Sequence, residues 1–549
     1  MKILLAAVNA KYIHSNLAVY SLKASAGACG TQVEIGEYTI NQQTDEILRD
    51  LYRKQPDVVA FSCYIWNRRI IGELIRELPK VLPGVCIWAG GPEVSYDASA
   101  FLREYPEAEG ILCGEGEGTF SRLAAYYIEG RGCLSGIPGL VYREADGSLH
   151  ETGAAQVPEM DDLPFVYEDI RAFQNRILYY ESSRGCPFRC SYCLSSIEKQ
   201  VRFRSLSLVE RDLMVFLKAE VPQVKFVDRT FNIDPDRTVR LWSFILEHDN
   251  GITNFHFEIG ADLITEEELQ IMSRMRPGLI QLEIGVQSTN LQTIREIDRR
   301  MDLAKLKEVV ERIRGFGNVH QHLDLIAGLP GEDLPGFRRS FDEVFALKPQ
   351  QLQLGFLKVL KGSGMCQKAA DYGLIFHGEP PYEVLRTDWL SYEDLLCLKG
   401  VEEMVEVYYN SGQFRQTLEE LLKRYQSPFD LFHELAVYYE DRGYDQVRHS
   451  RMARYEILRE FLREKGYPGA VYDQCMIYDL YAREHLKSRP PFAPDLRPYR
   501  KKLKEYERDY GKQVHVEVFL YDEERPVYVL FDYARRDPLT RDAHVEVLH

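Results

Sequence analysis

The stretch Cys186-Pro187-Phe188-Arg189-Cys190-Ser191-Tyr192-Cys193 is the most informative part of this chain. Its three cysteines stand four and three residues apart, and no other cysteine lies near them in the sequence. Three thiolates at this spacing can bind three irons of a [4Fe–4S] cluster, whereas ferredoxin-type clusters take four cysteine ligands. The spacing therefore predicts a cluster with one iron left open to a substrate or a cofactor, which favours catalysis over simple electron transfer.

Three alternative roles for these cysteines are less well supported. A structural zinc site needs four ligands, usually in two Cys or His pairs, and no matching pair is present. A disulfide framework is not expected in a 549-residue chain with 11 scattered cysteines and no recognisable signal peptide. Buried free thiols can also cluster by chance. We expect a buried thiol at Cys366, and dispersed core positions for the cysteines of the N-terminal region, which are Cys29, Cys63, Cys86, Cys113 and Cys133.

With the aromatic Tyr192 before its last cysteine, the motif resembles the C-x3-C-x-aromatic-C signature of the radical S-adenosylmethionine (SAM) superfamily. In that family the open iron chelates the methionine amine and carboxylate of SAM. An electron from the cluster then cleaves SAM to a 5′-deoxyadenosyl radical. The resemblance implies a [4Fe–4S] cluster held by the three cysteines, SAM as cofactor, and Tyr192 in the SAM site.

Composition limits the class of protein. The chain is 45% hydrophobic and 28% charged, with a formal net charge of −16, which is typical of a multidomain globular protein and makes nucleic acid an unlikely partner. No stretch of 18 apolar residues is present, so no membrane span is expected. Unpaired thiols and an oxygen-labile cluster predict a reducing cytoplasm, in an anaerobe.

Residues 1–135 alternate short apolar strands with amphipathic helices, here Thr44–Lys54 and Arg68–Leu82. The predicted strands are Ile3–Val8, Gln32–Ile35, Val58–Ser62, Cys86–Ala89 and Gly110–Cys113. This order predicts an α/β domain with a parallel, doubly wound, Rossmann-like sheet. Ligands of such sheets bind at the carboxyl ends of the strands.

Three loops rich in small and polar residues follow these strands. They are Ser62-Cys63-Tyr64-Ile65-Trp66, Gly90-Gly91-Pro92-Glu93 and Gly114-Glu115-Gly116-Glu117. Taken singly, such glycines more often make tight turns than bind ligands. Upstream of a radical SAM motif, however, the domain resembles the cobalamin-binding module of B12-dependent radical SAM enzymes. The resemblance implies a cobalamin site formed by Ser62, Tyr64, Trp66, Gly90, Gly91, Glu93, Gly114, Glu115, Gly116 and Glu117.

The domain departs from other B12 proteins in one respect. The Asp-x-His-x-x-Gly motif that supplies a histidine to cobalt is absent, and His14 is the only histidine in this region. In B12-dependent radical SAM enzymes, which this domain resembles, the cobalamin tail is commonly displaced and the lower face of cobalt has no protein ligand. We expect Tyr64 or Trp66 to pack beneath the corrin, and the alternative is that both rings are ordinary core residues.

Residues 136–175 are expected to form a connector with a hairpin at Asp146-Gly147, and residues 176–375 a second α/β domain. Its predicted strands are Leu178–Ser182, Val224–Val227, Asn254–Ile259, Leu279–Ile284, His320–Ile326 and Gln351–Leu357. Six βα units predict a partial, TIM-like (β/α)6 barrel, as the radical SAM superfamily shares. Functional residues of such barrels collect where the strands end.

Polar residues stand near these strand ends. Asp228 and Glu258 are expected to bind the SAM amine and ribose. The segments around Glu283 and Gln287, and around Asp324, are similar to segments of oxygen-independent coproporphyrinogen oxidases and methylthiotransferases. The resemblance implies SAM-binding roles for these residues and for Arg299, which is expected in the helix after the fourth strand.

Residues 376–549 are expected to be mostly helical, for example at Tyr392–Tyr409 and Met452–Lys465. A hairpin of Val514–Tyr521 and Val527–Tyr533 is predicted around Glu523-Glu524-Arg525. The region resembles an uncharacterised C-terminal domain found on some B12-dependent radical SAM proteins. We expect it to be a lid and substrate determinant.

The resemblance implies a cobalamin-dependent radical SAM enzyme, most often a methyltransferase that uses methylcobalamin to methylate an unactivated carbon. Its partners would be a small-molecule or peptide substrate and an electron donor such as flavodoxin or ferredoxin. A cyclase or rearrangement enzyme with the same cofactors, and a non-catalytic B12 or redox sensor, remain alternatives. Methylthiolation is a weaker candidate, because the usual auxiliary-cluster cysteines are not evident.

Overall fold

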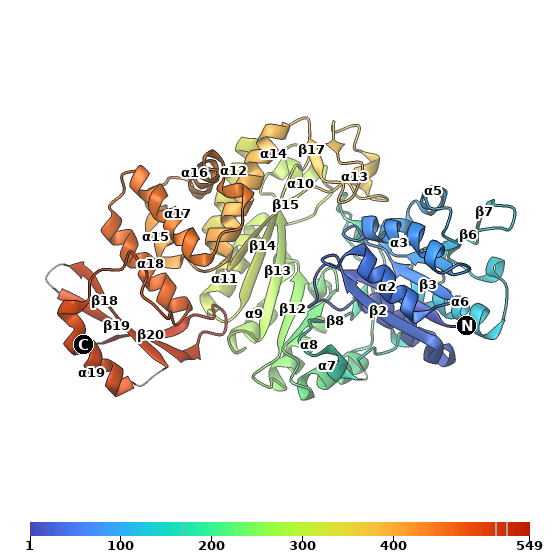
Figure 1. Cartoon of the computed structure of the whole chain (residues 1–549), viewed down its shortest axis with the longest axis horizontal. Helices are drawn as coiled ribbons and strands as arrows, with labels where there is room; N and C mark the ends of the chain where they lie inside the picture. Colours follow the sequence, from blue (N-terminus) through green and yellow to red (C-terminus); the bar gives the residue numbers. More distant parts are fainter. Residues whose placement is uncertain (168, 511–512, 523–524, 549) are drawn as a thin grey trace. The chain divides into compact units, whose positions relative to one another are not determined.

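The structure is a computed structural model that describes residues 1–549 except 168, 511–512, 523–524 and 549. Its chain divides into two compact units, and Figure 1 labels their helices and strands. The first unit comprises Met1–Arg274, Arg295–Met301 and Leu357–Thr387. The second comprises Met275–Ile294, Asp302–Phe356 and Asp388–His549.

The first unit begins with a seven-stranded sheet of order β2-β1-β3-β4-β5-β6-β7. Strands β1 to β5 are parallel, as the sequence predicts. Their bounds are Ile3–Asn9, Val33–Thr39, Val58–Ser62, Cys86–Gly90 and Gly110–Leu112. The expected hairpin forms β6 (Leu140–Arg143) and β7 (Leu149–Glu151), which pair antiparallel at the edge of this sheet. The connector thus contributes two strands to the first sheet.

Helices cover both faces of this sheet, so the predicted doubly wound arrangement is confirmed. In β1, Leu4 and Ala6 pack with α2 and α3, while the alternate residues Ile3 and Leu5 pack on the side of α1 and α6. Side chains of successive strand residues point to opposite faces, which accounts for this division. The helices are α1 (Leu17–Ser25), α2 (Thr44–Lys54), α3 (Arg68–Val81), α4 (Pro92–Ser95), α5 (Ala98–Glu104) and α6 (Gly116–Glu129).

The rest of the first unit contains three of the six predicted barrel strands. Strands β8 (Leu178–Tyr180), β11 (Gln223–Phe226) and β12 (Asn254–Ile259) are parallel, with β11 in the middle. A short antiparallel ribbon of β9 (Ser183–Arg184) and β10 (Arg202–Phe203) follows β8. The other elements are α7 (Leu206–Lys218), α8 (Pro235–Glu247), α9 (Glu266–Ser273), α13 (Gly364–Gln367), β16 (Ile375–Phe376) and β17 (Val384–Arg386).

The second unit contains the other three predicted strands. Strands β13 (Ile280–Gln287), β14 (His320–Ala327) and β15 (Gln351–Phe356) are parallel, with β14 in the middle. Helices α11 (Leu303–Phe316) and α12 (Leu334–Ala346) follow β13 and β14 in the chain. This order of strand and helix repeats the βα pattern that the sequence predicts.

The C-terminal region is mostly helical, as expected, with a small sheet at its end. Its helices are α14 (Tyr392–Met404), α15 (Arg415–Leu422), α16 (Pro428–Asp441), α17 (Arg451–Glu464), α18 (Gly469–Arg483) and α19 (Arg500–Tyr510). Strands β18 (Val514–Asp522) and β19 (Arg525–Arg536) form the predicted antiparallel pair, although Glu523 and Glu524 lie outside the described residues. A third strand, β20 (Ala543–Leu548), pairs with β19 and was not predicted. Among the described residues, no helix combines the length and the apolar character needed to span a membrane.

Candidate functional site

The cysteine loop begins and ends at the short β9–β10 ribbon. In this ribbon Arg184 lies opposite Arg202, so the two ends of the loop are held side by side. Gly185 joins the ribbon to Cys186 with a φ of +93°, and a Cβ at this position would lie 2.2 Å from the Gln200 carbonyl oxygen. Only glycine fits a backbone at this φ and this separation. The start of the cysteine loop is therefore sterically fixed.

The three cysteines lie close to one another in this loop. The backbone N–H of Cys193 donates to the carbonyl of Cys190 at 3.0 Å, which forms a turn. Burial raises the pKa of Cys186, and the neighbouring Cys193 and Cys190 raise that pKa further. A thiol whose neighbours are two more thiols is suited to bind a metal cluster that displaces the protons. The donor set fits three irons of a [4Fe–4S] cluster.

Arg299 adds a positive charge to this loop. Its Nη1 donates to the Tyr192 hydroxyl at 3.4 Å and to the Cys190 Sγ at 3.7 Å. A guanidinium beside a thiolate stabilises the negative charge of the thiolate. The expectation that Arg299 lies in a helix was wrong, because α10 (Leu291–Glu296) ends before Asp298, whose φ of +54° is not helical.

A cavity of about 460 Å³ lies at the carboxyl ends of β3, β4 and β5. Its lining contains the glycines of the loops after β4 and β5 and apolar residues such as Leu5, Val19 and Phe120. Of the residues predicted to bind cobalamin, those that line the cavity are Ser62, Tyr64, Gly90, Gly91, Gly114, Glu115, Gly116 and Glu117. The cavity thus brings together loops that are far apart in the sequence.

Two of the predicted residues lie away from this cavity. Trp66 is stacked on Tyr64 at 4.4 Å, but its ring is 44% exposed and its Nε1 donates to the Val8 carbonyl. Glu93 is buried against Arg68 and accepts a hydrogen bond from Tyr382. Of the two aromatic residues expected beneath the corrin, Tyr64 is therefore the one that faces the cavity, and the alternative of a core position is wrong for Trp66.

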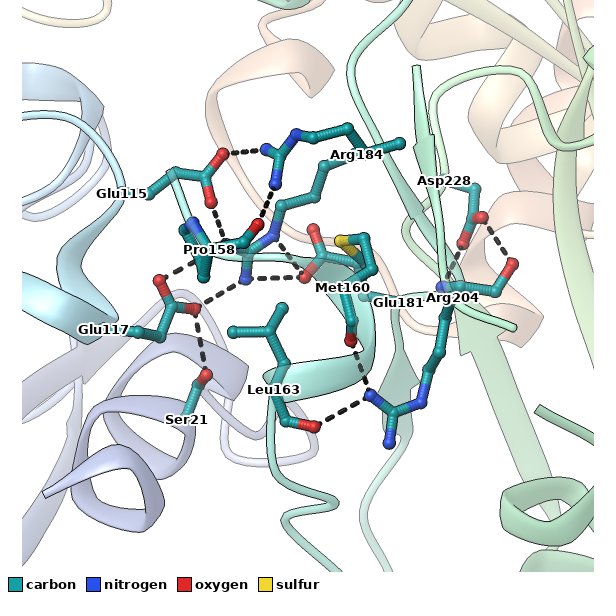
Figure 2. Close-up of polar contacts among 12 residues, drawn as sticks. Ser21, Glu115, Glu117, Pro158, Met160, Leu163, Glu181, Arg184, Arg204 and Asp228 are labelled. Atoms are coloured by element: carbon teal, nitrogen blue, oxygen red, sulfur yellow. Dashed lines mark hydrogen bonds and ion pairs between the residues drawn. The ribbon is translucent and has the colours of Figure 1, made fainter. Parts of the chain in front are cut away.

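The carboxylates of Glu115 and Glu117 are bound by arginines of the ribbon (Figure 2). Arg184 lies between them, 2.6 Å from an oxygen of each, and Arg202 pairs with Glu115 from the other side. Glu117 also accepts a hydrogen bond from the Ser21 hydroxyl. We call the set Glu115, Glu117, Arg184 and Arg202 the ion-pair bridge. The carboxylates of the two glutamates that the sequence assigned to cobalamin are thus paired with arginines.

Two carboxyls that pair with Arg184 have pKa values shifted in opposite directions. Burial raises the pKa of Glu117, but the guanidinium of Arg184 outweighs burial and holds that pKa below its ordinary value. Glu181, which also pairs with Arg184, is more deeply desolvated, and burial raises its pKa to about 7. Glu117 is therefore an anion at neutral pH, whereas Glu181 is poised between its two forms.

The cavity and the cysteine loop share residues. Arg184 and Glu198 line the cavity, and the carbonyl of Glu198 accepts from the N–H of Cys186 at 3.1 Å. Tyr96 also lines the cavity, and burial raises its pKa with a further contribution from the nearby Cys193. The loop that carries the thiols thus forms part of the cavity wall.

The SAM residues predicted in the first unit have other partners. Asp228 is buried and lies beyond the end of β11. It accepts hydrogen bonds from the N–H and hydroxyl of Ser182 and from the hydroxyl of Ser183. It therefore fixes the turn between β8 and β9. Glu258 lies near the end of β12 and is half-buried.

The SAM residues predicted in the second unit lie together. Glu283 is opposite His322 in the β13–β14 register, and Asp324 lies 3.1 Å from His322. Both acidic residues stand inside their strands, a few positions before the strand ends. Gln287 does end β13, with a φ of +70°. Its buried Oε1 has no hydrogen-bond partner within the described part of the chain, which fits a residue that awaits a ligand.

The other thiols differ in exposure. Cys29 and Cys63 are buried, as expected, but Cys86 and Cys113 are only partly buried. Cys133 is exposed, so its predicted core position was wrong; it precedes a short turn, and its Sγ lies 3.3 Å from the Ser135 hydroxyl. The buried thiol expected at Cys366 is also partly exposed.

Sequence reasoning missed Arg184, Arg202 and Tyr96. The position of Arg184 directly before Gly185 and Cys186 was a usable signal, because a charged residue at the start of a buried loop needs a partner. The partners themselves were not visible in the sequence, since Glu115 and Glu117 are distant from it along the chain.

Family models match three consecutive parts of the chain. The B12 binding domain matches residues 3–124, and the Radical SAM superfamily matches residues 180–344. The chain joins a B12 binding domain to a radical SAM domain. A third model, a protein of unknown function (DUF4080), matches residues 370–530. Most residues that line the cavity lie within the first match, whereas Arg184, Glu198 and the three cysteines lie within the second.

Characterised relatives include methyltransferases. The cobalamin-dependent radical SAM methyltransferase TokK of Streptomyces tokunonensis is 25% identical over 58% of this chain and 50% of its own length. The 2-(S-pantetheinyl)-carbapenam-3-carboxylate methyltransferase of Streptantibioticus cattleyicolor is 23% identical over 81% of this chain and 69% of its own. The chain thus spans half the length of TokK and about two thirds of the second enzyme.

Solved structures share the fold. The cobalamin-dependent SAM radical enzyme OxsB, with aqua-cobalamin and SAM bound, covers 92% of this chain and 80% of its own at 15% identity, with a TM-score of 0.60. The methyltransferase TsrM of Kitasatospora setae, with cobalamin and a [4Fe–4S] cluster bound, covers 70% of this chain and 79% of its own at 17% identity, with a TM-score of 0.55.

Proposed function

We propose that this chain is a cobalamin-dependent radical SAM enzyme that methylates an unactivated carbon. One observation carries the proposal: the loop with Cys186, Cys190 and Cys193 forms part of the wall of a cavity in the B12 binding domain. A metal cluster bound by this loop and a corrinoid bound in the cavity would lie next to each other, as a reaction that uses both groups requires. The methyltransferase names of two relatives support the reaction type.

Cys186, Cys190 and Cys193 would hold a [4Fe–4S] cluster, and Arg299 would stabilise the charge on the Cys190 sulfur. The hydroxyl of Ser191 is buried without a hydrogen-bond partner in the described part of the chain, and is available to a ligand. Tyr192, Asp228, Glu258, Glu283, Gln287, Arg299 and Asp324 are the proposed SAM-binding residues. Among them Gln287 has the strongest support, from its strained backbone and its unsatisfied oxygen. When bound, the cluster and SAM supply a carbon-centred radical, and cobalamin supplies the methyl group.

The cavity would hold the cobalamin. The glycines in its lining leave backbone N–H and carbonyl groups accessible to a ligand. Its apolar residues would contact the nonpolar part of a large ligand. Tyr64 is the aromatic residue placed to contact the corrin, and Ser62 lies at the same strand end. Trp66 would support Tyr64 by stacking, and Glu93 would act outside the cavity.

The remaining assignments concern domains and partners. We infer a cobalamin domain at 1–135, a connector at 136–175, a radical SAM domain at 176–375 and a C-terminal domain at 376–549 that determines the substrate. An electron donor such as flavodoxin or ferredoxin would reduce the cluster, in an anaerobic cytoplasm. The substrate would be a small molecule or a peptide.

A cyclase with the same cofactors is the second candidate. The anaerobic magnesium-protoporphyrin IX monomethyl ester cyclase of Rubrivivax gelatinosus is 22% identical over 56% of this chain and 57% of its own length. Methyl transfer and cyclisation differ in the fate of the SAM methyl group. A non-catalytic sensor would not cleave SAM at all.

The test uses purified, reduced protein with SAM whose methyl group is deuterated. A methyltransferase forms 5′-deoxyadenosine and incorporates the deuterated methyl group into a product from a cell extract. A cyclase forms 5′-deoxyadenosine but no labelled product. Absence of both 5′-deoxyadenosine and labelled product from a protein that contains cluster and corrinoid would contradict the proposal.

A further inference from the structure

The ion-pair bridge joins the two halves of the candidate site inside the first unit. Glu115 ends the loop after β5 and Glu117 lies in the first turn of α6, and both residues line the cavity. Arg184 and Arg202 face each other across the β9–β10 ribbon, where the cysteine loop begins and ends. Cys186 is two residues from Arg184. The bridge thus links the segment after β5, which lines the cavity, to the ribbon at which the cysteine loop begins and ends. Figure 2 shows Glu115, Glu117 and Arg184 among these contacts.

The bridge is built to hold a fixed geometry. Each of its side chains is at most 18% exposed, so water screens the charges weakly. Arg184 donates to Glu115, Glu117 and Glu181 together, and its planar guanidinium fixes the angles between them. Glu115 is shared by Arg184 and Arg202. A displacement of the loop 114–117 must therefore displace the ribbon or break a buried ion pair.

We propose that the ion-pair bridge couples cobalamin binding in the cavity to cluster binding in the cysteine loop, so that each group tightens the binding of the other. The inference rests on the proposed function for the identity of the two groups. Arg184, Arg202, Glu115 and Glu117 are positioning residues in this scheme, because they act through the backbone of the two loops. Coupling between two binding equilibria is reciprocal, so it can be measured from either site.

The test measures the affinity of the full-length protein for hydroxocobalamin, by equilibrium dialysis, with the cluster reconstituted and after its removal by a chelator. In the wild type the cluster should tighten binding by at least about fivefold, the lower end of typical couplings. In Glu117→Gln and in Arg184→Lys the ratio should fall below about twofold. Lysine keeps the charge of Arg184 but lacks its fork of donors.

Glu77→Gln is the matched control. Glu77 forms an exposed ion pair with Lys80 on α3, so its loss should leave the wild-type ratio unchanged. A residue with only a structural role would weaken binding equally with and without the cluster, and would not change the ratio. Should one variant fail to fold by circular dichroism, the other still tests the bridge, because the two substitutions alter different elements, α6 and β9.

The outcomes are distinct. A ratio that stays above about fivefold in both bridge variants would overturn the inference. So would equal hydroxocobalamin affinity of the wild type with and without the cluster, and either result leaves the proposed function standing. A wild-type protein that binds no hydroxocobalamin in either state would overturn the cobalamin part of the proposed function together with the inference.

Discussion

The loops after β4 and β5 look alike in sequence but differ in electrostatics. Each places a buried glutamate, Glu93 or Glu117, shortly after glycine. Glu93 accepts from the neutral Tyr382 hydroxyl and lies 3.6 Å from Arg68, and burial raises its pKa. Glu117 lies 2.6 Å from Arg184, whose charge outweighs burial and lowers its pKa.

The difference shows that partner geometry, more than burial, decides the charge of a buried carboxyl. A close guanidinium in hydrogen-bond contact stabilises the anion, whereas a neutral donor and a more distant cation leave the cost of desolvation partly unmet. The first loop is therefore suited to pack the β4 end against Tyr382. The second is suited to link its own position to that of the cysteine loop through the ion pair of Glu117 with Arg184.

Removal of Arg184 should have the largest effect on stability. Arg184→Met leaves Glu115, Glu117 and Glu181 without their shared cation, and the loss of one partner from a buried ion pair costs about 3–5 kcal/mol. The free energy of unfolding in urea measures the effect. Arg69→Met is the control, because Arg69 pairs with Glu73 on the surface and should cost less than about 1 kcal/mol. Equal effects of the two substitutions would contradict the assigned role of Arg184.

Glycine substitutions in the loop after β4 and in helix α6 should change stability in opposite directions. Gly91 has a φ of +112°, and a Cβ there would lie 2.5 Å from the Cys63 carbonyl oxygen. Gly91→Ala should destabilise the protein by about 2–3 kcal/mol. Gly118, within α6, has open space around its Cβ position, so Gly118→Ala should stabilise by about 0.5–1 kcal/mol. Thermal unfolding of both variants checks the sign as well as the size.

The two glutamates should differ when each is replaced by glutamine. Glu117→Gln removes the charge that pairs with Arg184, and charged hydrogen bonds contribute about 1.5–3 kcal/mol each. Glu93→Gln keeps an oxygen that accepts from Tyr382 and removes a poorly solvated charge, so its cost at neutral pH should stay below about 1 kcal/mol. A larger cost for Glu93→Gln than for Glu117→Gln would contradict the comparison.

The smallest expected effect is a difference in pH dependence. The folded-state pKa of Glu117 lies below its ordinary value of 4.5, so its stabilising contribution is present above pH 4.5 and is lost as the pH falls through the lowered value. The pKa of Glu93 is raised above 4.5, so its contribution is greatest below 4.5 and declines as the pH rises through the raised value. The stability difference caused by Glu117→Gln should therefore change with pH only below 4.5, where it shrinks as the pH falls. The difference caused by Glu93→Gln should change only above 4.5, where the contribution of Glu93 declines as the pH rises, and urea unfolding over a pH series measures both.

Local patterns predicted the elements well. The helix Thr44–Lys54 and the strands Val58–Ser62 and Asn254–Ile259 have the predicted bounds, because amphipathic periodicity or an apolar run sets each of them. Strand β20 was missed, since its polar and apolar residues alternate over only six positions and its pairing with β19 stabilises it.

The sequence predicted those parts of the site that depend only on the order of strands and loops along the chain. The glycine loops follow parallel strands, so their meeting at one cavity follows from topology. The hydrogen-bond and ion-pair partners of individual side chains could not be predicted from topology. Glu117 and Arg184 are 67 residues apart, and nothing in either segment shows that their charges meet rather than face a ligand. The exposure of Trp66 likewise depends on which face of its loop packs against β1.

The most direct test of the proposed function is the metal and corrinoid content of the wild type and of the triple variant Cys186→Ala/Cys190→Ala/Cys193→Ala, each prepared anaerobically with excess iron, sulfide and hydroxocobalamin. We predict about four irons and about one cobalt per wild-type chain, as one [4Fe–4S] cluster and one corrinoid require. The triple variant should lose the iron and keep the cobalt. A wild type with no cobalt, or a triple variant that retains its iron, would contradict the proposed function.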